Sequence, residues 1–228
     1  MSTVVVAGVL LVLLPIAFNL AFAMLAKAFE YPDVLRHPTA DVLARFRDGG
    51  SRLLLLWWGF ALTAVLLAPL AVLVSSSLDG AAPVVLQLGT AIGVLAAAVQ
   101  FLGLVRWPFL VPYLAREAES GDPARQAAVD IVFQAFNRYL GVAVGEHLGY
   151  LLTGAWSLLV GTAVVQSSAA PAWLGVVGIV AGLLLALCSL EFVGPNEREG
   201  WQVAARLTPV VYVVWSLWLV ALGVALHL

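Results

Sequence analysis

The stretch VVVAGVLLVLLPIAFNLAFAMLAKAF, residues 4–29, carries a single charge, on Lys27. A helix crosses the hydrocarbon core of a bilayer with about 20 mostly apolar residues, so this stretch is long enough to span it. A secretory signal peptide needs a basic segment before a short apolar core, whereas residues 1–6 carry no positive charge. We therefore predict a transmembrane helix that is retained in the mature protein.

Five further apolar stretches follow, each bounded by polar segments. The chain is 63% hydrophobic and only 11% charged, with a mean hydropathy of +1.03. Soluble domains are about 45–50% apolar and about 25% charged. We predict one all-α integral membrane domain over residues 1–228, a bundle of six transmembrane helices. The five further spans are Leu53–Val74, Val84–Val105, Tyr139–Val165, Ala172–Leu190 and Pro209–Leu226.

The basic residues give this bundle an orientation. Cytoplasmic loops of membrane proteins carry an excess of Lys and Arg. All eleven can be placed on one side, in or beside loops 30–52, 106–138 and 191–206, while connections 75–83 and 166–171 carry only Asp79 as a charge. We predict that both termini lie outside. The basic residues are Lys27, Arg36, Arg45, Arg47, Arg52, Arg106, Arg116, Arg125, Arg138, Arg198 and Arg206.

The first cytoplasmic loop contains a predicted helix of its own, over residues 40–48. Val42, Leu43 and Phe46 fall on one side of it, which suits a short helix lying at the membrane interface. Gly49-Gly50 ends it before the second span. Near the same membrane surface, Trp57, Trp58, Trp107 and Trp201 suit an interfacial aromatic belt.

The fourth predicted span holds the best candidate for chemistry, Glu146. At about 100° per residue, Glu146 shares a stripe with Tyr139, Tyr150, Thr153 and Ser157, and it lies about 12 Å deeper than Arg138. An acidic side chain at that depth costs about 2.5–3.5 kcal/mol and normally faces the bundle interior or a wet cavity. Glu146 is then either a neutral, hydrogen-bonded strut or a group that handles a ligand or proton. Candidate catalytic residues are Glu146, Tyr150 and the flanking His147.

Two further sets of residues belong to this hypothesis. Gly141, Gly145 and Gly149 recur every four residues, a spacing that allows close helix packing, as in a glycine zipper. Other polar residues could face the same interior and line a ligand pocket, although each alone fits an interhelical hydrogen bond of about 0.6–2 kcal/mol. These are Asn19, Gln100, Thr153, Glu191, Tyr212 and Ser216.

Several other functions have no support in the sequence. The net charge of −2 argues against a nucleic-acid partner. The chain has no phosphate-binding loop, no nucleophile elbow and no metalloprotease motif. Cys188 cannot form an internal disulfide, and no Cys/His spacing indicates a zinc site, so no metal site is predicted and no cofactor is named.

Three segments resemble an uncharacterised family of bacterial multi-pass membrane proteins, domain-of-unknown-function family 4386. They are EYPDVLRHPTADVLARFRDGG (30–50) before Trp57-Trp58, FNRYLGVAVGEHLGYLLTGAWSLLVG (136–161) and VVYVVWSLWLVALGV (210–224). The resemblance covers most of the chain. It implies a protein of the bacterial cytoplasmic (inner) membrane and supplies no catalytic residues.

Two functions from different classes follow as expectations. The first is a non-enzymatic protein in the lipid bilayer that binds a hydrophobic small molecule, or an accessory subunit that assembles with a membrane-protein partner. The alternative is an intramembrane enzyme or proton-coupled transporter, in which Glu146 exchanges protons while Tyr150 and His147 orient the substrate. A glutamine at position 146 separates them, because an amide can keep a strut's hydrogen bonds but cannot exchange the proton.

Overall fold

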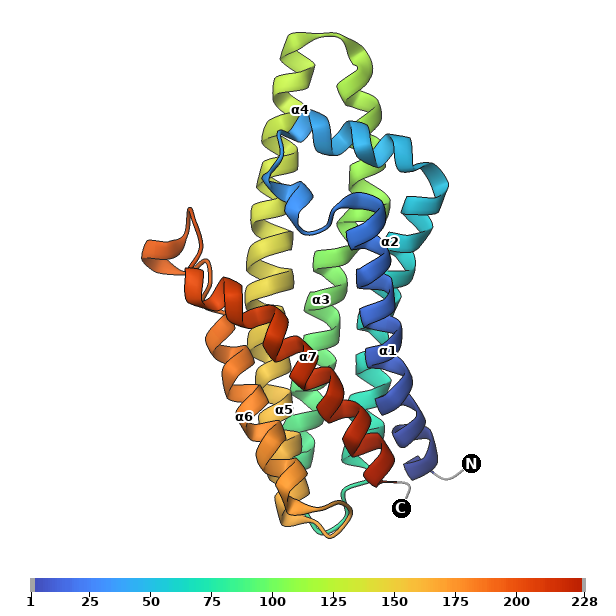
Figure 1. The fold of residues 1–228 in the computed structure, drawn as a ribbon, viewed down its shortest axis with the longest axis vertical. Helices are drawn as coiled ribbons and strands as arrows, with labels where there is room; N and C mark the ends of the chain where they lie inside the picture. The colour runs from blue at the N-terminus through green and yellow to red at the C-terminus, as the bar shows by residue number, and fades with distance from the viewer. Residues whose placement is uncertain (1–2, 227–228) are drawn as a thin grey trace.

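The computed structural model describes residues 3–226, which form helices joined by turns, without a β-strand in that range (Figure 1). One element, η3, is a π-helix. In chain order the elements are α1 (Thr3–Phe29), η1 (Asp33–Arg36), α2 (Thr39–Ser75), α3 (Pro83–Glu117), η2 (Ala118–Ser120), α4 (Pro123–Phe136), η3 (Asn137–Leu148), α5 (Gly149–Gln166), α6 (Ala172–Cys188), η4 (Gly194–Asn196) and α7 (Gln202–Ala225).

The predicted class, an all-helical membrane protein, is confirmed, with five to six apolar helices. Five helical columns have the length and composition to cross a membrane. The helix at the predicted fifth span, α6, is apolar but has only 17 residues. At about 1.5 Å per residue it reaches roughly 26 Å, slightly less than a hydrocarbon core of about 30 Å. The five long columns are Thr3–Phe29, Thr39–Ser75, Pro83–Ser120, Pro123–Gln166 and Gln202–Ala225.

The spanning helices form a closed ring. Each packs against its neighbours in the sequence, with α4, η3 and α5 acting as one column, and α7 packs against α1. Both ends of the described chain therefore lie at the same end of the bundle, beside the two short connections (Figure 1). Because the ring closes, side chains on the inner faces of all six helices can meet.

Glycine pairs bring α5 and α6 into backbone contact. A Cβ atom added at Gly154 would lie 2.5 Å from the carbonyl oxygen of Gly182, and one at Gly161 would lie 2.5 Å from that of Gly175. Both distances are shorter than any side chain tolerates. Small residues thus let these two helices pack along their length, as in other membrane bundles.

The predicted helix of the first loop is present as the beginning of α2. The chain bends at Gly50, whose φ of 56° and ψ of −152° are essentially accessible only to glycine. Val42, Leu43 and Phe46, the predicted apolar side, are buried against the bundle. This helix therefore lies across the half of the bundle opposite the termini, short of the tip of the α3–α4 hairpin (Figure 1). Its location at the membrane surface stays a prediction.

Two helical columns are longer than predicted. α3 continues past Val105 to Glu117, through Pro108 and Pro112. The hydrophobic character of the segment beyond each proline, and its burial, outweigh the lost backbone hydrogen bonds. Arg106 consequently lies inside the helix, not at the edge of a loop as predicted. Likewise, Pro123–Gln166 forms one continuous column, so residues 123–138 extend the span predicted from Tyr139.

The interior contains two hydrophobic clusters. One includes Trp156, Trp215 and Trp218 near the termini. The other lies toward the opposite end, where Trp57 and Trp107 stack with ring centroids 4.4 Å apart. Both of these tryptophans are fully buried, so their predicted place in an interfacial belt is wrong: they fall on inward helix faces and pack against each other.

Candidate ligand-binding site

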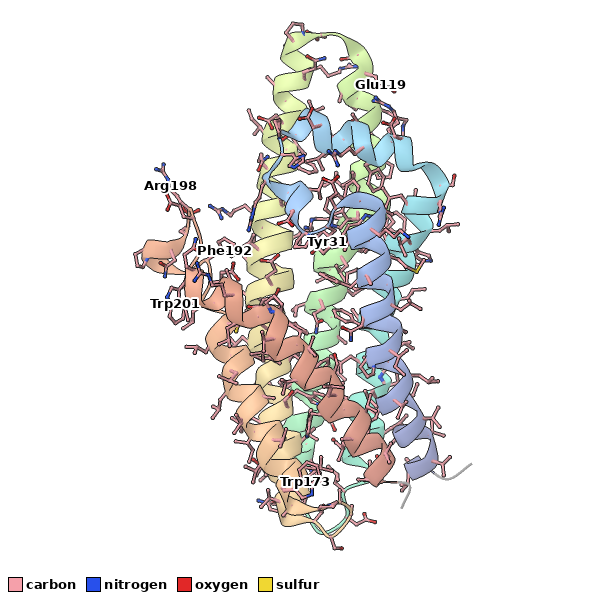
Figure 2. The ribbon with its side chains drawn as sticks, in the orientation of Figure 1. Tyr31, Glu119, Trp173, Phe192, Arg198 and Trp201 are labelled. Carbon is pink, nitrogen blue, oxygen red and sulfur yellow. The ribbon has the colours of Figure 1, made fainter. Side chains whose placement is uncertain are left out.

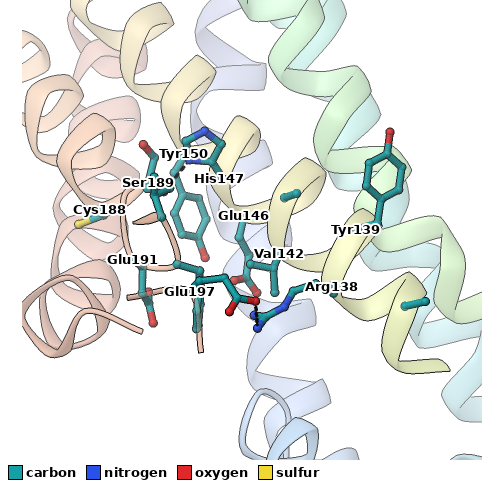
Figure 3. Close-up of a pocket in the computed structure, with 14 residues that line it drawn as sticks. Arg138, Tyr139, Val142, Glu146, His147, Tyr150, Cys188, Ser189, Glu191 and Glu197 are labelled. Carbon is teal, nitrogen blue, oxygen red and sulfur yellow. Dashed lines mark hydrogen bonds and ion pairs between the residues drawn. The ribbon is translucent and has the colours of Figure 1, made fainter. Parts of the chain in front are cut away.

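The π-helix η3 determines which side chains of the long column point together. Its hydrogen bonds run from residue i to i+5, so each turn holds more residues than an α-helix. Tyr139 and Glu146, predicted on one stripe, both line the pocket described below. Tyr139 is 67% exposed, and its ring points away from Glu146 (Figure 3).

The three predicted packing glycines face α3. Added Cβ atoms would meet α3 at three successive levels, so the missing side chains let η3 lie directly against that helix. At Gly141 the nearest atom is Nη2 of Arg106 at 2.7 Å, at Gly145 it is Cα of Gly103 at 3.1 Å, and at Gly149 it is Cγ of Gln100 at 3.1 Å.

Arg106 is a buried cation at this α3–η3 contact, with 7% of its surface exposed. Its Nε donates to Oδ1 of Asn137 at 3.1 Å, and its Nη1 donates to the carbonyl oxygen of Gly103. A buried charge is tolerated only where it is hydrogen-bonded or paired. Gly141 provides the room, because a side chain there would occupy the position of the guanidinium.

Arg106 belongs to a layer of polar side chains between the two hydrophobic clusters. The other members of this polar layer are Tyr31, Glu146, Tyr150 and Tyr212. Glu146 interacts electrostatically with Arg106 and with all three tyrosines. The rings of Tyr150 and Tyr212 lie 5.3 Å apart. The polar layer thus takes one residue from each of five segments: the turn after α1, α3, η3, α5 and α7.

The electrostatics of the layer are clearest at Tyr31, in the turn after α1. Burial, followed by the negative charge of Glu146, raises the pKa of Tyr31 to about 12, while the positive charge of Arg106 opposes that rise. The phenol of Tyr31 therefore keeps its proton at any physiological pH. It is available to the layer as a neutral hydrogen-bonding group.

Several oxygens of the layer have no protein partner. Within residues 3–226, neither the carboxylate of Glu146 nor the hydroxyls of Tyr31, Tyr150 and Tyr212 make a hydrogen bond or ion pair. These oxygens are not among the buried unpaired atoms, so they reach space that a water-sized probe can enter. Unpaired polar groups that face open space are available to bind water or a ligand.

Glu146 and Tyr150 also line a pocket of about 410 Å³ between η3 and the connection after α6 (Figure 3). Its walls are mainly apolar, with Val142, Phe192 and Val193 among them. Ligand pockets in proteins have this character: a cavity of about 300–1,000 Å³, mostly apolar, with a few polar groups. The described residues that line it are Ala135, Arg138, Tyr139, Val142, Ala143, Glu146, His147, Tyr150, Cys188, Ser189, Glu191, Phe192, Val193 and Glu197.

Polar contacts fix two walls of the pocket. Nδ1 of His147 lies 2.7 Å from the carbonyl oxygen of Ser189. A carbonyl can only accept, so Nδ1 carries the hydrogen and donates. On the opposite side, Arg138 forms an ion pair with Glu197. Both contacts join η3 to the connection that follows α6.

Glu191 adds a second carboxylate to the pocket. Burial raises the pKa of Glu191 above its usual range, and the positive charge of Arg36 opposes that shift. Glu191 makes no ion pair within residues 3–226, and Arg36 pairs instead with Asp33 at 3.5 Å. Partial burial without an ion-pair partner thus distinguishes Glu191 from the exposed acids nearby.

The remaining predicted pocket residues lie elsewhere, in interhelical hydrogen bonds. Nδ2 of Asn19 donates to Oγ of Ser216 at 2.9 Å and joins α1 to α7. Nε2 of Gln100 donates to Oγ1 of Thr153 at 2.9 Å and joins α3 to α5. None of these four lines the pocket. Tyr212 does not line it either, but it belongs to the polar layer beside Tyr150.

Sequence reasoning missed two residues of the site, Arg106 and Tyr31. The one-sided distribution of charge placed Arg106 at the edge of loop 106–138, whereas it lies inside α3. Tyr31 lies in a turn far from Glu146 in the sequence, and no spacing indicates their proximity. As for metals, no group of three His, Cys, Asp or Glu side chains in the described part of the chain could hold one.

The fold and the site define a multi-helix membrane protein with a polar layer and a mainly apolar pocket in one half of the bundle. The family described as Domain of unknown function (DUF4386) matches residues 6–223, nearly the whole chain, so the chain belongs to that family. No curated protein and no solved structure matches it.

Proposed function

We propose that this protein binds an amphipathic small molecule in the pocket beside Glu146, within a bacterial cytoplasmic membrane. The observation that carries the proposal is the pocket itself, about 410 Å³ with apolar walls and a few convergent polar groups. An apolar body would lie against Val142 and Phe192, and a polar head would face Glu146 and Glu191. The unpaired carboxylate of Glu146 supports this arrangement.

The proposed orientation places both termini outside. All five ion pairs within residues 3–226 lie in the segments opposite the termini. Figure 2 shows Glu119 and Arg198 toward that end and Trp173 at the other. Since cytoplasmic loops are rich in Lys and Arg, that end would be cytoplasmic, and the short helix of α2 would lie at the inner interface.

Cysteine labelling tests this orientation. Asp79 and Ser120 are exposed at opposite ends, while the native Cys188 is buried and should not react. In intact cells, an impermeant maleimide should label Asp79→Cys but label Ser120→Cys only after the membrane is opened. Labelling of both positions from outside would contradict the proposal.

Ligand binding is tested by filling the pocket. Ala143 is exposed at the pocket wall, so Ala143→Trp should place an indole inside the cavity. The matched control is Ala128→Trp, because Ala128 is also exposed but lies on α4 outside the pocket. Each protein is purified into lipid nanodiscs, and extracted small molecules are compared by mass spectrometry. An amphiphile retained by the wild type and the control, but lost from Ala143→Trp, is the expected result; identical extracts from all three would contradict binding in this pocket.

A second function, proton exchange at Glu146, is favoured by one observation: buried Arg106 interacts electrostatically with this carboxylate. Such a pair can exchange a proton or a counter-charge as a substrate enters. The test is infrared difference spectroscopy before and after the amphiphile is added. A carboxyl band that changes in the wild type and is missing in Glu146→Gln supports proton exchange, while the absence of such a band refutes it.

A further inference from the structure

The polar groups of the pocket are of one chemical kind. Of the ionic side chains that line it, Arg138 is paired with Glu197, which leaves the carboxylates of Glu146 and Glu191. Ionised carboxylates only accept hydrogen bonds. No unpaired Lys or Arg lines the pocket within residues 3–226. A ligand head would therefore meet two carboxyl groups without an ion-pair partner, and a cationic head favours their ionised, accepting form.

His147 adds to the same preference. Since its Nδ1–H donates to the carbonyl oxygen of Ser189, the neutral ring keeps Nε2 as an acceptor. Tyr150 can donate or accept and carries no charge. The free polar groups thus match a head that donates hydrogen bonds and carries positive charge, and they do not match a phosphate, sulfate or carboxylate.

Basic residues near the pocket do not reverse this balance. Arg106 faces Glu146 from α3, but it does not line the pocket, and its Nε and Nη1 donate to Asn137 and Gly103. Its charge offsets that of Glu146 at most, which leaves Glu191 without an ion-pair partner. Arg36 acts on Glu191 from a distance, while it is largely exposed and paired with Asp33.

The pocket also offers aromatic surface. Phe192 and Tyr150 both line it. A cation is attracted to the face of an aromatic ring, so aromatic walls favour ammonium groups in particular. From these contacts we infer that the pocket selects an amphipathic amine, whose ammonium group lies between Glu146 and Glu191 and whose apolar body lies against η3 and Phe192. This inference rests on the proposed binding function and names its ligand class.

The test uses three molecules that share one apolar cage: 1-adamantylammonium, adamantane-1-carboxylate and 1-adamantanol. Each is titrated by calorimetry into the full chain in nanodiscs, with empty nanodiscs as the blank. We expect the ammonium to bind at least tenfold more tightly than the carboxylate or the alcohol. The double variant Glu146→Gln/Glu191→Gln should lose at least tenfold in affinity for the ammonium.

Glu199→Gln is the matched control, because Glu199 lies in the same connection as Glu191 but does not line the pocket. The affinity of this variant for the ammonium should equal that of the wild type. Equal or tighter binding of the carboxylate or the alcohol overturns the inference, and so does a double variant with wild-type affinity. If the three cages all fail to bind while Ala143→Trp still loses the retained amphiphile, the amine preference is wrong and the binding function stands. If Ala143→Trp loses nothing, the binding function itself fails.

Discussion

Gly103→Ala should push α3 away from η3, and with them Arg106 away from Glu146 in the polar layer. A Cβ atom at position 103 would lie 2.6 Å from Cα of Gly145 and 3.0 Å from the carbonyl oxygen of Leu140. Ordinary contact begins at 3.4 Å, so the first distance is 0.8 Å too short. Because both neighbours are backbone atoms, no side chain can rotate away, and the helices themselves must move.

The expected cost follows from a matched control. Gly59→Ala also replaces a helical glycine, but its Cβ would meet no atom within 4 Å. Both substitutions gain up to about 1 kcal/mol in helix propensity, so that gain cancels in the comparison. Overpacking costs about 1–3 kcal/mol, and Gly103→Ala should be less stable than Gly59→Ala by about that amount.

The assay uses the single native cysteine. Cys188 is fully buried, so a thiol-reactive dye reports unfolding as the protein is titrated with denaturing detergent. The unfolding free energies of the two variants are compared in the same lipid–detergent mixture. Equal stability would refute the close approach of α3 and η3, and with it the geometry that holds Glu146 near Arg106.

Three other predictions follow. Gly50→Ala meets no steric neighbour but forces a positive φ of 56° on alanine, so the unfolding free energy should fall by about 1–3 kcal/mol in the same dye assay; no change would contradict the bend. Trp215→Phe removes the 2.8 Å hydrogen bond to Ser157 and should lower the unfolding free energy by about 0.5–1.5 kcal/mol. Trp173 is exposed, so Trp173→Phe should leave the unfolding free energy unchanged. The part of the tyrosinate absorbance that Tyr31→Phe removes should titrate with a pKa of about 12. Because folding raises this pKa above 10.0, the unfolding free energy should decline as the pH rises from 10.0 toward 12. If that part of the absorbance titrates near 10.0, the burial of Tyr31 is refuted.

The membrane fold could be predicted because lipid leaves few alternatives. Backbone groups must be satisfied within each span, so a long apolar stretch implies a helix. Residues 4–29 show this directly, since the helix there ends at Phe29 as expected. Helix ends were less predictable. A proline such as Pro108 usually ends a helix, yet α3 continues for nine more residues, most of them apolar and with Val111, Leu114 and Ala115 buried.

The candidate site could be predicted only along a single helix. Glu146, His147 and Tyr150 were found because they are close in the sequence and lie deep in a span. Their positions relative to one another were predicted for an α-helical turn, whereas residues 137–148 form the π-helix η3. Electrostatic interactions between distant segments, such as that of Tyr31 with Glu146, depend on how the ring of helices closes, and no local pattern records that.

The two roles predicted for Glu146 differ in what they require of its surroundings. A structural strut requires partners, because an acidic group inside a membrane is tolerated when hydrogen bonds satisfy it. The expected partner Thr153 instead accepts from Gln100, and the hydroxyl of Tyr150 is unbonded within the described residues. What remains near Glu146 is the charge of Arg106 on one side and the pocket on the other. A carboxylate held between a fixed cation and an open cavity is suited to exchanging partners, and this favours a ligand-handling role over a structural one.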